Sequence, residues 1–223
     1  MISALFFDLD GTLIDTADDL AASLNLVRQQ SYRLPPLPTA QLRAYASRGA
    51  AGLLRAGLDL TPEDAAFEPA RLLFLEHYAQ HLSDHVCFFP GIEALLERLD
   101  RHGLPWGIIT NKHQRFTAPV LAYLGLDRRA ACVVSGDTTA HAKPHPMPLL
   151  YAAQAVGVPP QQCWFVGDDH RDIDAARAAE YQRAIAVHWG YLGDKPIEAW
   201  GADAIIDAPE ELWEMIVRNQ ESA

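Results

Sequence analysis

Asp8 and Asp10 stand two residues apart at the end of a short apolar run, residues 4–9. The run is too brief for a helix before Gly11, so it predicts a buried strand. Residues two apart on a strand point the same way, and both carboxylates should therefore project together from its carboxyl end. Two carboxylates so close repel each other, and a bound divalent cation is the usual remedy.

The charge of the whole chain limits which ligands can bind. The sequence has 29 acidic and 18 basic residues, a formal net charge of −11. Such a field repels nucleic acid and anionic lipid surfaces, so we expect neither a nucleic-acid nor a membrane partner. An anionic small molecule would need local compensation from a metal ion, a lysine or backbone amides.

Short apolar runs alternate with helical periodicity outside one segment. The runs that predict strands are 4–9, 106–110, 132–135, 163–166, 184–187 and 204–206, and helical spacing marks 92–99, 116–124, 148–156, 173–180 and 212–217. This alternation predicts an α/β domain, a doubly wound (Rossmann-like) parallel sheet whose ligands bind at the carboxyl ends of the strands.

The segment between Asp15 and Phe88 has no convincing strand and predicts helices over 16–30, 39–46 and 61–82. The last of these should start at the capping-box pattern Thr61-Pro62-Glu63-Asp64. We therefore expect a catalytic α/β core of residues 1–14 and 89–223 and a small all-helical domain, residues 15–88, inserted after the first strand.

The three cysteines, Cys87, Cys132 and Cys163, fit neither a disulfide framework nor a paired metal-ligand spacing. The N-terminal run is interrupted by aspartates and has no basic residues before it, unlike a signal peptide or a membrane span. A reducing cytoplasm is the simplest prediction for the location of the protein.

Four ordered motifs together resemble those of the haloacid dehalogenase-like hydrolases. They are Asp8-Leu9-Asp10-Gly11-Thr12-Leu13-Ile14-Asp15, Ile108-Ile109-Thr110-Asn111, Lys143-Pro144-His145-Pro146 and Gly167-Asp168-Asp169-His170-Arg171-Asp172. The resemblance implies a phosphatase in which Asp8 attacks phosphorus and forms an aspartyl phosphate. Asp10 would protonate the leaving oxygen and then activate water.

The same resemblance implies how charge is handled. Lys143 would neutralise both the phosphate and the nucleophile, and phosphoryl oxygens would be held by Gly11, Thr110 and Asn111. The expected cofactor is Mg²⁺, bound by Asp8, the carbonyl of Asp10, and Asp168, with Asp172 acting through water or by orienting the other ligands and Asp169 nearby.

The helical insertion resembles the cap of this superfamily, which closes over the substrate and supplies specificity. Within it, Arg48 and Gly49 interrupt two helical patterns and could form a substrate-binding loop; the alternative is a surface arginine beside a turn. Closure would hinge near Asp15 and residues 89–91.

Nearly the whole chain resembles the phosphoglycolate phosphatase group, which implies a role in carbohydrate metabolism and a small phosphorylated metabolite, 2-phosphoglycolate, as substrate. Residues 110–112 with 115–116, residues 167–169 with 171–172, and residues 201–203 also resemble its N-acetylmuramic acid 6-phosphate phosphatase branch. Glu180 departs from the glycine that commonly ends the helix after the fourth motif. The expected assembly is a monomer or a homodimer.

Three rival functions share parts of this pattern. A dehalogenase would attack carbon and need no metal, and Asp10 argues against it. A phosphoryl-accepting signalling receiver also uses an aspartate, a hydroxyl residue and a lysine, but receivers are shorter and lack a cap. A sugar-phosphate mutase would differ from a phosphatase only in its product.

Overall fold

The computed structural model describes residues 1–193 and 195–221. Six strands form a parallel sheet in the order β5-β4-β1-β6-β7-β8. Their bounds are β1 (Ala4–Phe7), β4 (Trp106–Ile109), β5 (Val133–Val134), β6 (Cys163–Gly167), β7 (Arg183–Val187) and β8 (Ala204–Ile206). The chain runs outward from β1 to β5, then crosses back to β6 and continues to β8. The predicted doubly wound sheet is confirmed.

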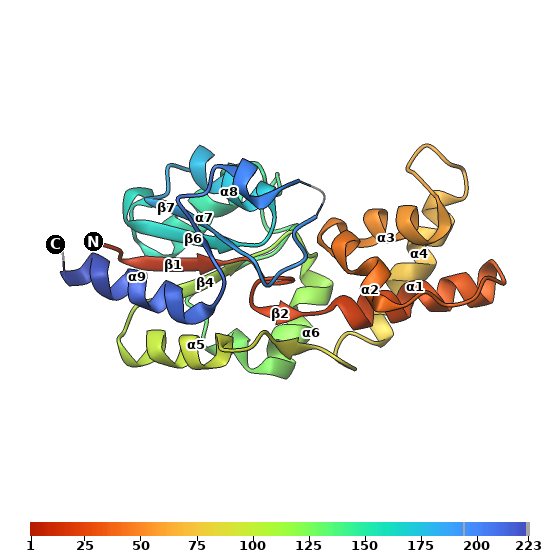
Figure 1. Cartoon of the computed structure of the whole chain (residues 1–223), viewed down its shortest axis with the longest axis horizontal. Coiled ribbons are helices and arrows are strands. Elements are labelled where there is room, and N and C mark those ends of the chain that lie inside the picture. The colour runs from red at the N-terminus through yellow and green to blue at the C-terminus, as the bar shows by residue number, and fades with distance from the viewer. Residues whose placement is uncertain (194, 222–223) are drawn as a thin grey trace. The chain divides into compact units, whose positions relative to one another are not determined.

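Helices cover both faces of this sheet (Figure 1). One face carries α5 (Ile92–Arg101), α6 (Gln114–Leu124) and α9 (Pro209–Glu221), and the other carries α7 (Met147–Val156) and α8 (His170–Ala178). Short 3-10 turns are η2 (Leu126–Arg128), η3 (Pro160–Gln162) and η4 (Ile197–Trp200). Every residue of β1, β4 and β6 is buried, which explains their unbroken apolar sequences.

The register of the central strand determines which residues meet at its carboxyl end. Leu5 of β1 lies opposite Trp106 of β4 on one side and Trp164 of β6 on the other. The pairing continues one residue past β1, because Asp8 N donates to Val166 O at 2.9 Å. The residues that follow β1, β4 and β6 are thereby brought to one edge of the sheet, at the point where the strand order reverses.

The chain divides into two compact units, one of Met1–Ile14 with Phe88–Ala223 and one of Asp15–Cys87. The second unit contains α1 (Ala17–Ser31), α2 (Thr39–Leu42), η1 (Arg43–Arg48), α3 (Gly49–Leu58) and α4 (Phe67–Gln80). Two-residue strands, β2 (Ile14–Asp15) and β3 (Cys87–Phe88), form a separate sheet where the chain crosses between units. The role of the helical unit as a cap stays a prediction.

The predicted start of the last helix of this unit is wrong, because α4 begins at Phe67 rather than Thr61. The Thr61 pattern does form locally: Asp64 Oδ2 accepts from Thr61 N at 2.7 Å and from Thr61 Oγ1 at 2.9 Å. However, Phe67 N then donates to Asp64 O at 2.9 Å, which closes a second turn instead of extending a helix. A capping motif therefore satisfied its own polar groups without starting a helix.

Glu180 takes the conformation that a glycine would take after α8. The helix ends at Ala178, and Glu180 has φ of +58°. Its N–H donates to Arg177 O at 3.0 Å, and the next residue, Tyr181, donates to Ala176 O at 3.0 Å. These bonds satisfy the last carbonyls of the helix, so the chain ends α8 without glycine at some cost in backbone strain.

In the part of the chain that the structure describes, no helix combines the length and the apolar character needed to cross a membrane.

Candidate active site

Lys143 lies between two of the predicted site aspartates. Its Nζ is 2.9 Å from Asp8 Oδ1 and 2.7 Å from Asp172 Oδ1, and its side chain is 2% exposed. The ammonium group also lies 5.1 Å from the centre of the Phe165 ring. A buried cation is tolerated when it is paired, so the two carboxylates and Lys143 stabilise one another.

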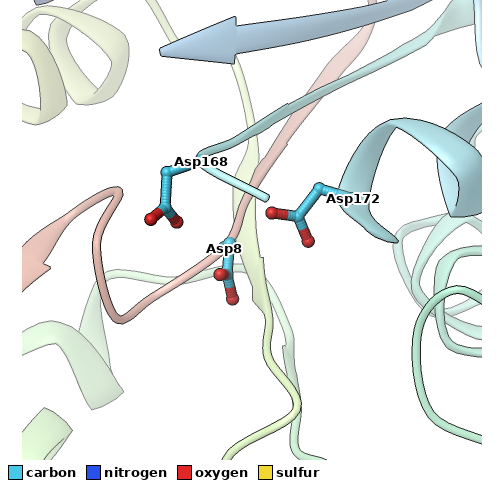
Figure 2. Close-up of side chains that lie close together, drawn as sticks. All are labelled: Asp8, Asp168 and Asp172. Carbon is cyan, nitrogen blue, oxygen red and sulfur yellow. The ribbon is translucent and has the colours of Figure 1, made fainter. Parts of the chain in front are cut away.

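Asp8, Asp168 and Asp172 form the one cluster of metal-ligating side chains found among the described residues, with carboxylate oxygens within 4.8 Å of one another. Figure 2 shows Asp8 at the end of β1, Asp168 after β6 and Asp172 on the first turn of α8, with Asp8 and Asp168 close together. Carboxylate oxygens are the ligands that hard divalent cations such as Mg²⁺ prefer. The donor set therefore fits the predicted cofactor.

The electrostatics of the cluster also favour a cation. Burial raises the pKa of Asp168 well above its ordinary value, and the charges of Asp8 and Asp172 raise it further. Burial raises the pKa of Asp172 to about 7 although Lys143 opposes the shift. Burial lowers the pKa of Lys143, but Asp172 and Asp8 outweigh this and raise it. One lysine does not neutralise three carboxylates, and a divalent cation would supply the missing charge.

Asp168 is held in place by neighbours on both sides. Its Oδ1 accepts from Thr12 Oγ1 at 3.1 Å and its Oδ2 accepts from Tyr191 N at 2.8 Å. Gly11 and Gly190 pack so closely that a Cβ at either would lie 2.1 Å or 2.2 Å from an atom of Asp168. Glycine at both positions is thus a condition for this carboxylate to sit where it does.

Asp169 and Asp172 form a capping box at the start of α8. Asp169 Oδ1 accepts from Arg171 N at 2.9 Å, and Asp172 Oδ2 accepts from Asp169 N at 3.1 Å. Asp169 also pairs with the Arg171 side chain at 2.7 Å. Asp172 therefore caps the helix with one oxygen and faces Lys143 with the other, whereas Asp169 lies outside the metal-ligating cluster.

The predicted phosphate-binding residues are already engaged with the protein. Asn111 exchanges two bonds with the Lys143 backbone, Nδ2 to Lys143 O and Lys143 N to Oδ1, both at 2.9 Å. Thr110 Oγ1 accepts from Lys112 N at 3.1 Å. Gly11 N donates to Ile14 O at 2.9 Å. The Asn111 side chain thus positions Lys143 in this structure.

Asp10 does not join the carboxylate cluster. Its Oδ1 lies 2.9 Å from Lys112 Nζ, and the Lys112 side chain is 8% exposed. The two aspartates that follow β1 are therefore held by two different lysines, Asp8 by Lys143 and Asp10 by Lys112. Sequence reasoning assigned no role to Lys112; its place directly after the Thr110-Asn111 strand end was the available signal.

Arg48 and Gly49 lie in the helical unit. Arg48 is exposed and is the last residue of η1, and Gly49 starts α3 with φ of +56°. They form the predicted break between two helical segments. A role in reading a substrate stays a prediction.

Comparison with known proteins places this site in a family. A family model for haloacid dehalogenase-like hydrolases matches residues 5–186. The chain is 42% identical over 215 residues to a phosphoglycolate phosphatase of Xanthomonas campestris pv. campestris (strain 8004), with 95% of each chain covered. It is 38% identical over 219 residues to the N-acetylmuramic acid 6-phosphate phosphatase of Pseudomonas aeruginosa, covering 97% of this chain and 96% of that one.

Solved structures agree with this placement. The crystal structure of a predicted phosphoglycolate phosphatase from Haemophilus somnus 129PT matches with a TM-score of 0.84 and 27% identity, over 96% of this chain and 98% of that chain. The predicted enzyme class, a phosphatase, is confirmed by these relatives. Because the family model spans every motif from Asp8 to Asp172, the chain belongs to the haloacid dehalogenase-like hydrolase family.

Proposed function

We propose that the protein is a Mg²⁺-dependent phosphomonoester hydrolase that works through an aspartyl phosphate on Asp8. The observation that carries this proposal is the position of Asp8, which shares Lys143 with Asp172 and shares a cation-sized cluster with Asp168 and Asp172. A carboxylate next to a lysine and a cation site can approach a phosphate dianion, because the positive charges offset the repulsion between them.

The proposed first step uses Asp8 and Asp10. An Asp8 oxygen forms a bond to phosphorus while the bond from phosphorus to the ester oxygen breaks, and Asp10 donates its proton to that leaving oxygen. In the second step the Asp10 carboxylate takes a proton from a water molecule whose oxygen forms a bond to phosphorus while the bond from phosphorus to the Asp8 oxygen breaks. Inorganic phosphate leaves, and both aspartates return to their starting states.

The remaining residues would bind the phosphate and the magnesium ion and orient the reacting groups. Thr110 would donate its hydroxyl proton to a phosphoryl oxygen, and Lys143 would hold a second oxygen while Asn111 fixes the lysine backbone. Asp8, Asp168, Asp172 and the carbonyl of Asp10 would hold the magnesium ion. When bound, that ion supplies positive charge beside the phosphoryl oxygens.

The proposed substrate is a small phosphorylated metabolite, with 2-phosphoglycolate first because several relatives carry the name phosphoglycolate phosphatase. N-acetylmuramic acid 6-phosphate is the second candidate, supported by relatives of similar identity and coverage. We also propose that residues 15–88 act as a cap, that Arg48 and Gly49 read the leaving group, and that the enzyme works in the cytoplasm as a monomer or homodimer.

Turnover of 4-nitrophenyl phosphate tests the chemistry. Activity should require added Mg²⁺. The Asp8→Asn variant should lower kcat by about 10⁴-fold or more while its circular dichroism spectrum stays that of the wild type. Activity that persists in excess chelator, or in Asp8→Asn, would overturn the mechanism.

Hydrolysis of 2-phosphoglycolate and N-acetylmuramic acid 6-phosphate, measured side by side, decides between the two substrates. Arg48→Ala should raise KM for the preferred one far more than for 4-nitrophenyl phosphate. If Arg48→Ala changed KM equally for both compounds, Arg48 would contribute to packing and not to recognition of the leaving group.

A further inference from the structure

Lys112 is an unusual residue in this chain. The sequence has three lysines, Lys112, Lys143 and Lys195, and the first two lie at the candidate active site while Lys195 is exposed. The proposed chemistry gives Lys143 a task but gives none to Lys112. A lysine side chain that is 8% exposed is costly to place unless its charge meets an anion.

The backbone of Lys112 is fixed from several directions. Its N–H donates to Thr110 Oγ1 at 3.1 Å, and its carbonyl accepts from Gly136 N at 2.9 Å and from Thr117 Oγ1 at 3.1 Å. The side chain therefore starts from a fixed point beside the carboxyl end of β4. At its far end, the ammonium group is held beside Asp10 by an ion pair at 2.9 Å.

The proposed reaction uses Asp10, whose Oδ1 lies against Lys112 in this structure. Asp10 has to reach the ester oxygen that leaves phosphorus, and an anion that takes its place beside Lys112 would free it to do so. Such an anion would also balance the charge of this buried ammonium group while Asp10 acts. The anion that Lys112 binds in this structure is a CH₂–COO⁻ group, the side chain of Asp10, held at 2.9 Å.

We propose that Lys112 binds a carboxylate on the leaving group of the substrate, which takes the place of the Asp10 side chain. This inference rests on the proposed function and narrows it to phosphate esters whose alcohol carries a carboxylate. The carboxymethyl group of 2-phosphoglycolate is chemically the same group that Lys112 holds here, and the lactyl ether of N-acetylmuramic acid 6-phosphate also ends in a carboxylate. Binding of the correct substrate thereby releases Asp10 for proton transfer.

Two matched pairs of esters test the proposal. In the first pair, 2-phosphoglycolate is compared with 2-hydroxyethyl phosphate, in which a hydroxymethyl group replaces the carboxylate. In the second pair, N-acetylmuramic acid 6-phosphate is compared with N-acetylglucosamine 6-phosphate, which lacks the whole lactyl ether that carries the carboxylate. The readout is the ratio of kcat/KM within a pair for the wild type, Lys112→Met, Lys112→Arg and the matched control Lys195→Met. If a Lys112 variant acted only by disturbing Asp10, kcat/KM would fall equally for both esters of a pair and the ratio would stay unchanged.

The wild type and Lys195→Met should prefer the carboxylate ester in at least one pair. Lys112→Met should lower that preference about 100-fold, mainly through KM, and Lys112→Arg should restore part of it. If Lys112→Met does not give a folded circular dichroism spectrum, Lys112→Gln replaces it.

An unchanged ratio in a folded Lys112 variant, or a wild type that prefers the neutral ester in both pairs, would overturn the proposal. Failure of the proposed function looks different. In that case Asp8→Asn would retain turnover of the carboxylate and neutral esters alike.

Discussion

Lys143 Nζ lies 2.7 Å from Asp172 Oδ1, and both side chains are 2% exposed. The same ammonium group contacts Asp8, so one buried cation joins the proposed nucleophile to the first turn of α8. The same three charges thus hold together two elements of the fold and take part in the proposed chemistry.

Replacing Lys143 should lower stability as well as activity. In Lys143→Met, Asp8 and Asp172 lose their shared cation, and breaking a buried pair in this way costs about 3 kcal/mol. Urea unfolding without metal measures the loss, with the exposed Lys195→Met as control, which should change the free energy of unfolding by less than about 0.5 kcal/mol. A Lys143→Met protein as stable as the wild type would show that the pair contributes nothing.

Magnesium should stabilise the protein through the carboxylate cluster. A ligand that binds only the folded state, at 100 times its Kd, adds about 2.7 kcal/mol to the free energy of unfolding, so melting temperature should rise with added Mg²⁺. Asp168→Asn should abolish the rise, whereas Asp174→Asn, an exposed aspartate on α8, should keep it. If Mg²⁺ raised the melting temperature of Asp168→Asn as much as that of the wild type, the ion would have to bind at another site.

Gly11→Ala should damage the cation site. A Cβ at this position would lie 2.1 Å from Asp168 Oδ2, and the backbone has φ of +91°. We expect a loss of about 1–3 kcal/mol in stability and at least a tenfold higher Mg²⁺ requirement. Gly125→Ala is the control, because Gly125 has φ of +70° but no atom within 4 Å of its added Cβ. The Gly125→Ala variant should show the same backbone strain as Gly11→Ala but need no more Mg²⁺ than the wild type. If both variants needed equal concentrations of Mg²⁺, the contact with Asp168 would not explain the effect of Gly11→Ala.

The helical unit should lose stability as pH rises past neutrality. Asp19, fully buried, accepts from His85 N at 2.9 Å and lies 2.8 Å from His85 Nδ1. This hydrogen bond raises the pKa of His85 above 6.5, so its contribution is complete below pH 6.5 and is lost as pH rises through the raised value. Burial also raises the pKa of Asp19 above 3.8, so the stability that its protonated form contributes begins to be lost above that pH, at lower pH than the loss caused by His85 begins.

Thermal unfolding of the full chain at several pH values between about 6 and 9 measures this effect. His85→Gln should flatten the decline, and His77→Gln, a histidine of α4, should leave it as in the wild type. Equal slopes for the wild type and His85→Gln would rule out the Asp19–His85 contact as its cause.

Sequence patterns predicted the sheet and which residues would meet at its edge, because the candidate site residues follow strand ends. Asp8, Thr110 and Asp168 each follow a buried apolar run, and parallel strands bring such ends to one edge. Lys143 follows no strand, and its identification came from family resemblance. The contact of Lys112 with Asp10 joins residues of different motifs, and only the folded chain shows it.

The helical unit was harder to predict than the sheet. Helix α3 was not predicted, because Gly49, Gly52 and Gly57 lower its helix propensity, and packing overrides that preference: Gly57 lies against Leu24 so closely that a Cβ would be 2.5 Å from it. The predicted start of α4 was wrong for the opposite reason, because the capping pattern at Thr61 formed a turn instead of a helix. The α3 error comes from contacts between helices that outweigh local preference, and the α4 error from a local signal that a turn also satisfies.

The place of β1 in the sheet has a consequence for protein synthesis. Asp8 is made before the strands on either side of β1, which contain Trp106 and Trp164 and leave the ribosome much later. Until β6 emerges, the apolar strand before Asp8 lacks one of its two neighbours and is open to misassociation. A nascent chain that stops before β6 should therefore be inactive and dependent on chaperones, although it already contains its nucleophile.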